Sequence, residues 1–352
     1  MNIKSLKIRD RNIGLGSPCF VIAEAGVNHN GKIEMAKALI DLAKTAGADA
    51  VKFQTFRAEN LVSPTERKAR YQVENTGTDE LQFEMLKALE LSGPDFRELA
   101  RHCREKEILF LSTPFDEESA DLLAEIDVAA YKISSGDVTN LPFLRYVAGK
   151  RKPIIFSTGM AVLSEVETAL KSIRATGNRE VIVLHCVTNY PADPHDINLR
   201  AMETIARTLG VLVGLSDHTL GIEIPIAAVA LGARVIEKHF TLDRSLPGPD
   251  HQTSLDPSEL KALVRGIRNV EAALGDGIKR PAASELENLP IGRKSLHWRR
   301  SLTVDAVVSA GDLIALRPGS GIPPSEITSL LGKRLICAVE MGTIVRRNDF
   351  QK

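Results

Sequence analysis

Short apolar runs alternate with longer amphipathic stretches along most of the chain. In the stretches 34–46, 163–175 and 257–274, apolar residues recur every three or four positions, which predicts helices with one buried face. The pattern Ser164-x-x-Glu167 and the pair Asp256-Pro257 predict the starts of the last two of these helices. The apolar runs have the length of buried strands. They are 19–26, 50–55, 108–115, 129–135, 153–159, 181–186, 211–217 and 234–240.

Strands that alternate with helices predict a parallel sheet with right-handed crossovers. Eight such units within about 275 residues favour an α/β fold of the closed (β/α)8 TIM-barrel type over an open doubly wound sheet. Gly14 and Gly16 form a lone Gly-x-Gly that precedes the first run instead of following it. We interpret this pair as a hairpin turn and not as a dinucleotide-binding loop.

The alternation stops near Gly275, so we place the barrel domain at 1–278. The segment 279–296 contains two prolines and more basic than acidic residues, which is typical of a linker. Residues 297–352 carry short β-like pieces separated by glycine- and proline-containing turns, which predicts a small β-rich domain. A domain of about 50 residues buries little apolar surface by itself, so we expect it to dock on another surface.

Composition narrows the function classes. The 352 residues include 45 Lys and Arg and 45 Asp and Glu, and this zero net charge disfavours a nucleic-acid partner. An apolar content of 43 % excludes a disordered chain. We find neither a membrane-length apolar run nor a secretory signal, and therefore expect a soluble cytoplasmic protein with no membrane partner. Cys19, Cys186 and Cys337 lie in or beside apolar stretches and are expected to be buried free thiols.

Charged and hydroxyl side chains mark the ends of the apolar runs. In a barrel the C-terminal ends of the strands meet at one mouth, which holds the active site. So many polar ends at one mouth are hard to explain by solvation, and we interpret them as a functional site. They are Glu24, Lys52, Gln54, Ser112, Thr113, Lys132, Ser134, Ser135, Ser157, Thr158, His185, Ser216, Asp217, His218, Glu237, Lys238 and His239.

His218 and His239 end consecutive strands. Because adjacent strands lie about 4.8 Å apart, both imidazoles can reach one ion. Two histidines with open coordination positions suit Mn²⁺, Co²⁺, Mg²⁺ or Zn²⁺ acting on a carbonyl oxygen. Glu24, Glu237 or Asp250 could complete or support the coordination sphere. Alternatively, either histidine is a hydrogen-bonded core residue.

Lys52, Lys132 and Lys238 lie within apolar strands, where an unpaired ammonium group is costly. A phosphate, or a phosphate with a carboxylate, accounts for all three and predicts a cationic mouth on a neutral protein. Hydroxyl donors would come from Ser135, Ser157 and Ser216. The alternatives are ion pairs with neighbouring glutamates and, for Lys132, a Schiff base with a carbonyl substrate.

Nine motifs follow one another at the strand ends. They are IAEAGVNHNG (22–31), VKFQT (51–55), STPFD (112–116), YKISSGD (131–137), STGM (157–160), LHCVTNYP (184–191), GLSDHT (214–219), EKHFTLDR (237–244) and PGPDH (247–251). In this order they resemble the sialic acid (nonulosonic acid) synthase family, of the N-acetylneuraminate or N,N'-diacetyllegionaminate type. SLTV (301–304) and LRPGSGIPP (316–324) resemble that family's C-terminal antifreeze-like (SAF) domain. The resemblance covers essentially the whole chain.

The resemblance implies an enzyme that condenses phosphoenolpyruvate with an N-acetylated mannose-type sugar aldehyde and water. The products are a nine-carbon 2-keto sugar acid and phosphate, which leaves by C–O cleavage. His218 and His239 match ligands of a divalent metal, foremost Mn²⁺, with Mg²⁺ or Co²⁺ as alternatives, and Glu24 matches the carboxylate that handles protons or orients water. The phosphoenolpyruvate site is matched by Lys52, Thr113, Lys132, Ser135, Ser157 and Ser216. Sugar- or metal-facing positions are matched by Gln54, Asp137, Tyr190, Glu237 and Asp250.

The resemblance also implies a domain-swapped homodimer in which Arg317 of the antifreeze-like domain reaches the partner's sugar and its N-acetyl group. Two positions depart from the family pattern. Thr188 stands where some members have an asparagine two residues before the tyrosine, with Asn189 one step on, and the segment 311–317 is shorter than in typical members. The stretches 52–56, 71–72 and 248–257 resemble the legionaminate type or general sialate enzymes more than the pseudaminate type.

Two other functions stay open at this stage. A pyruvate-dependent aldolase would use Lys132 to form a Schiff base with free pyruvate. A non-catalytic carbohydrate-binding protein would use the antifreeze-like domain as its binding module. The second alternative is disfavoured, because a pure binder needs neither Glu24 nor a pair of histidines.

Overall fold

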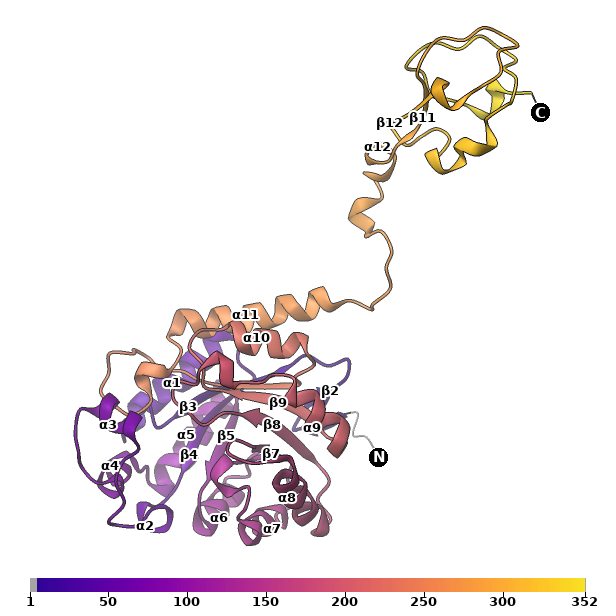
Figure 1. Cartoon of the computed structure of the whole chain (residues 1–352). Helices are drawn as coiled ribbons and strands as arrows, with labels where there is room; N and C mark the ends of the chain where they lie inside the picture. The colour runs from indigo at the N-terminus through magenta and orange to yellow at the C-terminus, as the bar shows by residue number, and fades with distance from the viewer. Residues whose placement is uncertain (1–4, 352) are drawn as a thin grey trace. The chain divides into compact units, whose positions relative to one another are not determined.

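Eight parallel strands close into a barrel in the first part of the chain (Figure 1). A computed structural model describes residues 5–351, and the chain divides into two units between Gly275 and Asp276. Each strand pairs with the next one along the sequence, and the last pairs with the first, which confirms the predicted TIM-type barrel. The strands are β3 Phe20–Gly26, β4 Ala50–Thr55, β5 Leu109–Pro114, β6 Tyr131–Ile133, β7 Ile154–Ser157, β8 Val181–Cys186, β9 Leu212–Asp217 and β10 Val235–His239.

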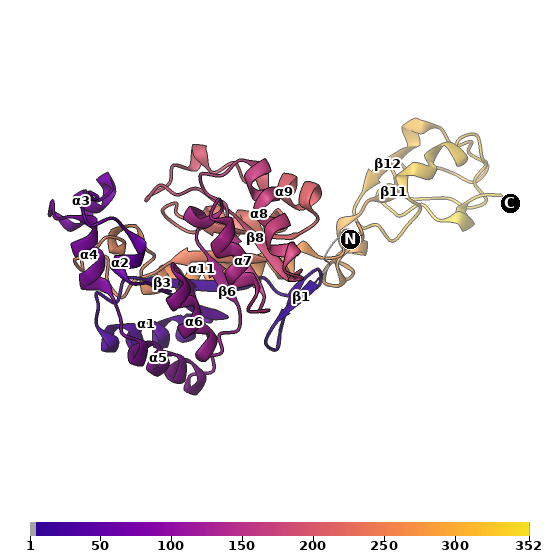
Figure 2. The ribbon, with the colours of Figure 1, turned by 90° about the horizontal axis from the view of Figure 1, so that it is seen from below.

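Helices surround the strands (Figure 2). Their apolar faces pack on the outward-facing strand residues, and side chains such as Leu39, Val51 and Leu263 belong to one large buried cluster. These helices are α1 Ile33–Ala46, α5 Gly93–Glu105, α6 Glu117–Glu125, α7 Leu141–Ala148, α8 Leu163–Ala175, α9 Ala201–Leu209, α10 Glu223–Ala230 and α11 Pro257–Leu274. Three further helices, α2 Ala58–Leu61, α3 Arg70–Thr76 and α4 Gln82–Leu89, form an excursion between β4 and α5.

A hairpin fills one end of the barrel. Its strands are β1 Ser5–Ile8 and β2 Arg11–Gly14, and its side chains Leu6, Ile8 and Ile13 join the inward-facing residues near the strand starts in a second buried cluster. The hairpin turns at residues 9–10, whereas Gly14 ends β2 and Gly16 lies in the turn that follows. The predicted hairpin turn at Gly14 and Gly16 is therefore wrong in position. The polar side chains that line the cavity lie at the opposite end of the barrel, at the C-terminal ends of the strands.

The helix starts test two capping predictions. Asp256 accepts hydrogen bonds from the backbone N–H groups of Ser258 and Glu259 at 2.8 and 2.9 Å, which confirms the start of α11. In contrast, α8 starts at Leu163, and the N–H of Val162 donates to Glu165 at 2.9 Å. The predicted Ser164–Glu167 capping box is therefore wrong, because the helix begins before Ser164.

Within the described residues 276–351, the second unit has an antiparallel pair of strands, β11 Ser295–Trp298 and β12 Leu313–Leu316. Its core gathers around Trp298 and contains ten buried apolar side chains. Within the predicted β-rich domain, the pieces 301–308 and 333–339 pair through isolated bridges instead of forming longer strands. β11 begins inside the segment 279–296 that the sequence assigns to a linker, which also contains the short helix α12 Leu289–Gly292.

Cysteine burial and surface charge complete the description. Cys19, Cys103 and Cys186 are buried free thiols, but Cys337 is exposed, so its predicted burial is wrong.

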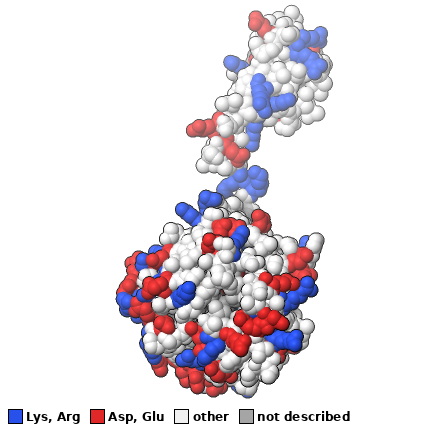
Figure 3. All heavy atoms as spheres, turned by 90° about the vertical axis from the view of Figure 1, so that its left-hand side faces the viewer, with Lys and Arg blue, Asp and Glu red and all other residues white. Residues whose placement is uncertain are grey.

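On the face of the first unit seen in Figure 3, acidic and basic side chains are interspersed, in agreement with the zero net charge. Among residues 5–351, no helix is long and apolar enough to cross a membrane. The cytoplasmic location stays a prediction.

Gly214 in β9 provides a test of the barrel packing. A Cβ atom at this position would lie 2.2 Å from the carbonyl oxygen of Val235 and 2.7 Å from Cδ2 of Leu184. Since that carbonyl belongs to the neighbouring strand, we expect Gly214→Ala to lower the free energy of unfolding by about 1–3 kcal/mol in denaturant titrations. Gly93→Ala, where the nearest atom is the flexible end of Arg97 at 3.4 Å, is the control and should unfold like the wild type. Equal losses in both variants would contradict the packing described here.

Candidate active site

A cavity of about 500 Å³ opens at the C-terminal ends of the barrel strands. Most of the residues nominated from the sequence line it, because consecutive strands carry them to the same mouth. These residues are Glu24, Lys52, Gln54, Thr113, Lys132, Ser135, Ser157, Tyr190, Ser216, His218, Glu237 and His239. Ser134, Gly136 and Thr188 also contribute to the lining, whereas Asn189 is exposed outside it.

The other polar residues at the strand ends do not reach the cavity, because successive side chains of a strand point to opposite faces. Lys238 lies between two inward-facing residues of β10 and points to the other side of the strand. There it is buried, its Nζ lies 2.5 Å from Oδ2 of Asp217, and it donates to the carbonyl of Thr219. His185 likewise lies outside the lining and bonds to the carbonyl of Ile197 at 2.5 Å. The predicted place of Lys238 in an anion site is therefore wrong.

The cavity floor holds a network of two lysines and two glutamates. Lys52 Nζ lies 2.7 Å from Glu24 Oε2 and 3.9 Å from Glu237 Oε2, and Lys132 Nζ lies 3.4 Å from Glu237 Oε1. Lys52 also donates to the hydroxyl of Thr113 at 3.0 Å. Each of the four charged side chains is at most 5 % exposed. The two ammonium groups are thus paired with carboxyl groups, which confirms the ion-pair alternative for Lys52 and Lys132, and the cationic mouth predicted from these lysines is wrong.

The two carboxyl groups differ in their affinity for protons. Burial raises the pKa of Glu24 to about 7, with Lys52 opposing the shift and Glu237 adding to it. Burial also acts on Glu237, but Lys132 and Lys52 outweigh it and hold the pKa of Glu237 below its usual value. Glu237 is therefore ionised at neutral pH, whereas Glu24 exchanges a proton there. Such a pair is suited to acid–base chemistry.

The two histidines face each other in neutral form. Their ring centroids lie 5.6 Å apart, and burial lowers the pKa of His218 to about 4 and that of His239 well below its usual value. Nδ1 of His218 bonds to the carbonyl of Val187 at 2.5 Å, which leaves Nε2 to accept from the hydroxyl of Tyr190 at 2.9 Å. Nδ1 of His239 is buried without a hydrogen-bond partner among the described residues.

This geometry fits a divalent ion held by two protein ligands. Neutral imidazoles bind metals, and a backbone carbonyl commonly fixes the second nitrogen of a ligating histidine, as Val187 does for His218. Within residues 5–351 there is no cluster of three or more histidine, cysteine, aspartate or glutamate side chains arranged to hold a metal. Water or substrate oxygens would therefore complete the coordination of an ion bound by His218 and His239.

An aromatic stack forms the wall beside the histidines. Tyr190 stacks on His218 with ring centroids 4.0 Å apart, meets His239 edge-on at 5.5 Å, and stacks on Tyr71 at 5.3 Å. The sequence nominated Tyr190 but not Tyr71 as a site residue. Tyr71 lies in α3, far beyond the end of β4. A search for polar residues at the ends of apolar runs therefore misses it. The same holds for Gln82, another lining residue of the excursion.

Three further nominated residues, which do not end strands, also lie outside the lining. Asp137 accepts a hydrogen bond from Asn140 at 3.2 Å in the turn after β6. Asp250 is buried, which raises its pKa to about 6, and its charge acts on Tyr71 and on Tyr190 from outside the cavity lining. Arg317 is exposed in the second unit, at the surface hollow that also contains Trp298.

The sequence matches the model of the NeuB family over residues 39–279. The chain belongs to the NeuB family. Residues 293–351 match the SAF domain, so both the predicted family and the predicted antifreeze-like domain are confirmed.

Two relatives and one solved structure are similar to this NeuB-family chain over most of its length. It is 50 % identical to the N,N'-diacetyllegionaminic acid synthase of Legionella pneumophila over 94 % of each chain. It is 35 % identical to the human N-acetylneuraminate-9-phosphate synthase, over 94 % of this chain and 92 % of the human one. The N-acetylneuraminic acid synthetase of Leptospira borgpetersenii serovar Hardjo-bovis superposes with a TM-score of 0.72 at 37 % identity, covering 82 % of this chain and 95 % of that one.

Proposed function

We propose that this chain condenses phosphoenolpyruvate with an N-acetylated mannose-type sugar aldehyde and water, releasing a nine-carbon 2-keto sugar acid and phosphate. The main support is the cavity floor, where two lysines, two glutamates of opposed pKa shifts and two neutral histidines meet. The names of the relatives, which are synthases of nine-carbon sugar acids, agree with this reaction.

Phosphoenolpyruvate brings a phosphate and a carboxylate, which need several cationic and hydroxyl donors. Lys52 and Lys132 would supply the ammonium groups, exchanging their present glutamate partners for the anion. The hydroxyl of Ser157 is buried without a hydrogen-bond partner among the described residues and is therefore available to donate. Further hydroxyl donors at the same floor are Thr113, Ser135 and Ser216.

Glu24 is placed to move the proton that the reaction requires. The methylene carbon of phosphoenolpyruvate attacks the aldehyde carbon. The aldehyde oxygen takes up the electron pair of the C=O double bond and becomes a hydroxyl after protonation. Water then adds to the resulting cationic carbon, and one of its protons passes to Glu24. The tetrahedral species expels phosphate with the bridging oxygen, and the remaining proton of the added water leaves with the phosphate as the 2-keto group forms. A carboxyl group with a pKa of about 7 can accept this proton at neutral pH and return it.

We assign His218 and His239 as the ligands of a divalent ion, Mn²⁺ foremost, with Mg²⁺ or Co²⁺ as alternatives. When bound, such an ion supplies Lewis acidity that polarises the aldehyde oxygen of the sugar. The hydrogen bond from Tyr190 to His218 Nε2 has to open for this nitrogen to act as a ligand. Tyr190 then lies free beside the sugar, with its ring still packed between Tyr71 and His218.

The preferred sugar is a diacetamido-trideoxy analogue of N-acetylmannosamine, because identity to the N,N'-diacetyllegionaminic acid synthase exceeds identity to the neuraminate enzyme by a wide margin. Parallel phosphate-release assays with this analogue and with N-acetylmannosamine test the assignment. We expect a higher kcat/KM for the analogue. No release with any N-acetylated sugar, in the presence of phosphoenolpyruvate and Mn²⁺, would contradict the proposed function.

A pyruvate aldolase is the second candidate, since burial lowers the pKa of Lys132 and so favours a nucleophilic amine. The negative charge of Glu237 at 3.4 Å opposes this shift and favours the protonated form of Lys132. Borohydride reduction in the presence of pyruvate would attach the pyruvyl group to Lys132 if a Schiff base forms. We expect no such adduct.

We further propose a domain-swapped homodimer in which exposed Arg317 reaches the sugar in the partner's barrel. Loss of one hydrogen bond to a charged group should raise the KM for the sugar by about 10- to 100-fold in Arg317→Ala, with the KM for phosphoenolpyruvate unchanged. Mixing this variant with His239→Ala should restore part of the activity, because one site of the mixed dimer is then intact. A kinetically silent Arg317→Ala would contradict the shared site.

A further inference from the structure

The cavity at the barrel mouth has two chemically different parts. Its floor is built by strand residues and carries the lysines, glutamates and histidines described above. Its outer wall is built by residues beyond the strand ends, where apolar and aromatic side chains lie beside polar ones such as Gln82, Ser134 and Thr188. The side chains that give this wall its apolar character are Ala69, Tyr71, Phe115, Met160 and Tyr190. A ligand that fills both parts must therefore combine an anionic or polar end with an apolar end.

Tyr71 is the outermost ring of the aromatic stack, at 5.3 Å from Tyr190 and nearly parallel to it. Its helix α3 is held firmly although it lies outside the barrel. Lys68 has no exposed side-chain area and donates to Thr76, Thr78 and Glu80 at 2.7, 2.8 and 3.0 Å. Asn75 Nδ2 donates to the carbonyl of Pro249 at 2.6 Å, which ties α3 to the loop after β10.

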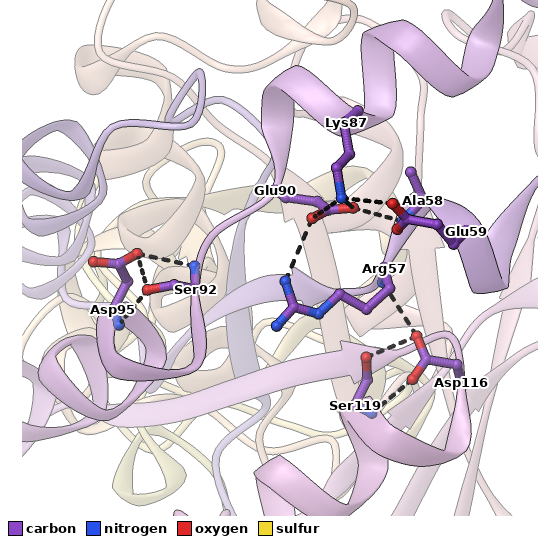
Figure 4. A network of polar contacts seen from close by, with 9 residues as sticks. All are labelled: Arg57, Ala58, Glu59, Lys87, Glu90, Ser92, Asp95, Asp116 and Ser119. Atoms are coloured by element: carbon purple, nitrogen blue, oxygen red, sulfur yellow. Dashed lines mark hydrogen bonds and ion pairs between the residues drawn. The ribbon is translucent and has the colours of Figure 1, made fainter.

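The base of the same excursion is clamped by Glu90 (Figure 4). Its carboxylate accepts from the backbone N–H of Ala58 at 2.6 Å and pairs with Lys87 at 3.1 Å and Arg57 at 3.4 Å. The N–H of Arg57 also donates to Asp116, the residue that caps α6, at 3.2 Å. Both ends of the excursion are thus joined to each other and to the barrel, and the ring of Tyr71 is positioned before any substrate arrives.

We propose that Tyr71 is a specificity-determining residue that selects sugars carrying methyl and acetamido groups over sugars carrying hydroxyls at the positions facing its ring. This role rests on the proposed function, because the sugar must occupy the cavity beside Tyr190. A hydroxyl against the ring loses its bonds to water without a replacement, whereas a methyl group gains contact with the ring. Apolar walls of this kind discriminate by about 10- to 200-fold.

Kinetics with two sugars test the role of the Tyr71 ring. We would compare the wild type, Tyr71→Ala and Tyr71→Phe, using the diacetamido-trideoxy analogue and N-acetylmannosamine. We expect Tyr71→Ala to lower kcat/KM for the analogue by about 10- to 100-fold and to affect N-acetylmannosamine much less, so that the preference largely disappears. Tyr71→Phe keeps the ring and should keep the preference. The KM for phosphoenolpyruvate, which binds at the floor, should be unchanged in both variants and so reports an intact fold.

Three outcomes would overturn the proposal, and a fourth would contradict the proposed function on which it rests. Equal losses for the two sugars in Tyr71→Ala would make the ring a general support of the site and not a selector. A Tyr71→Phe variant that behaves like Tyr71→Ala would assign the selection to the hydroxyl instead of the ring. A wild type that is inert toward both sugars would contradict the proposed function itself, and an active wild type without any preference would contradict the role of Tyr71 alone.

Discussion

Replacing Glu24 by glutamine is expected to lower kcat by about 10²- to 10⁴-fold, the usual contribution of a positioned acid or base. Glutamine has the shape of glutamate but cannot take the proton of the attacking water. Glu24 is buried beside Lys52 at 2.7 Å, and Lys52 keeps Glu237 at 3.9 Å as a second partner, so the variant should still fold and bind phosphoenolpyruvate. Steady-state phosphate release at saturating substrates measures the loss.

The pH profile separates a proton-transfer role from a structural one. Because Glu24 must be ionised to act as a base and its pKa is about 7, kcat/KM of the wild type should rise with pH up to about 7 and then level off. This limb should be absent from the residual activity of Glu24→Gln. Glu34→Gln, on an exposed position of α1, is the control and should retain the full profile. Near wild-type turnover by Glu24→Gln would contradict the assignment.

His239→Ala is expected to lose both bound metal and most of the activity. Removing residues that merely support a metal ligand costs about 10- to 100-fold in affinity or activity, so loss of one of only two protein ligands should cost more. Nδ1 of His239 is buried and has no hydrogen-bond partner among residues 5–351, so removing the ring should leave no protein donor or acceptor unpaired. Metal content after dialysis against Mn²⁺, together with phosphate release, measures the effect.

A histidine remote from the mouth provides the matched control. His102 lies on α5 and bonds to Asp41 at 2.9 Å on the outside of the barrel. His102→Ala should keep its metal content and turnover. Unchanged metal content in His239→Ala would show that the pair is a core feature and would refute the ligand assignment.

The barrel and much of the site could be predicted because both follow from one periodic pattern. Apolar runs of strand length fix the strands, and the barrel then brings residues as distant as Glu24, Lys132 and His239 to one mouth. The pattern of apolar runs does not by itself tell which face of a strand a polar residue occupies. Lys238 follows an inward-facing glutamate and precedes an inward-facing histidine, so alternation turns it outward to Asp217.

Other features depend on contacts that no local pattern contains. The charge balance of the floor arises because Glu24 and Glu237 come from neighbouring strands and pair with the two lysines; the sequence offered such ion pairs as an alternative but could not decide between them and an anion site. Tyr71 reaches the cavity only through the fold of the excursion that Lys68 and Glu90 hold together. The resemblance drew attention to the stretch 71–72, but the contact of Tyr71 with Tyr190 in the cavity could be found only from the position of α3.

One isotope experiment tests the central claim most directly. Phosphoenolpyruvate labelled with ¹⁸O in the bridge between carbon and phosphorus is incubated with the chain, Mn²⁺ and the diacetamido-trideoxy sugar. The proposed reaction predicts one phosphate for each nine-carbon acid formed, with the label in the phosphate, and no release when the sugar is omitted. Label retained in the sugar acid, or phosphate released without the sugar, would contradict the proposed condensation.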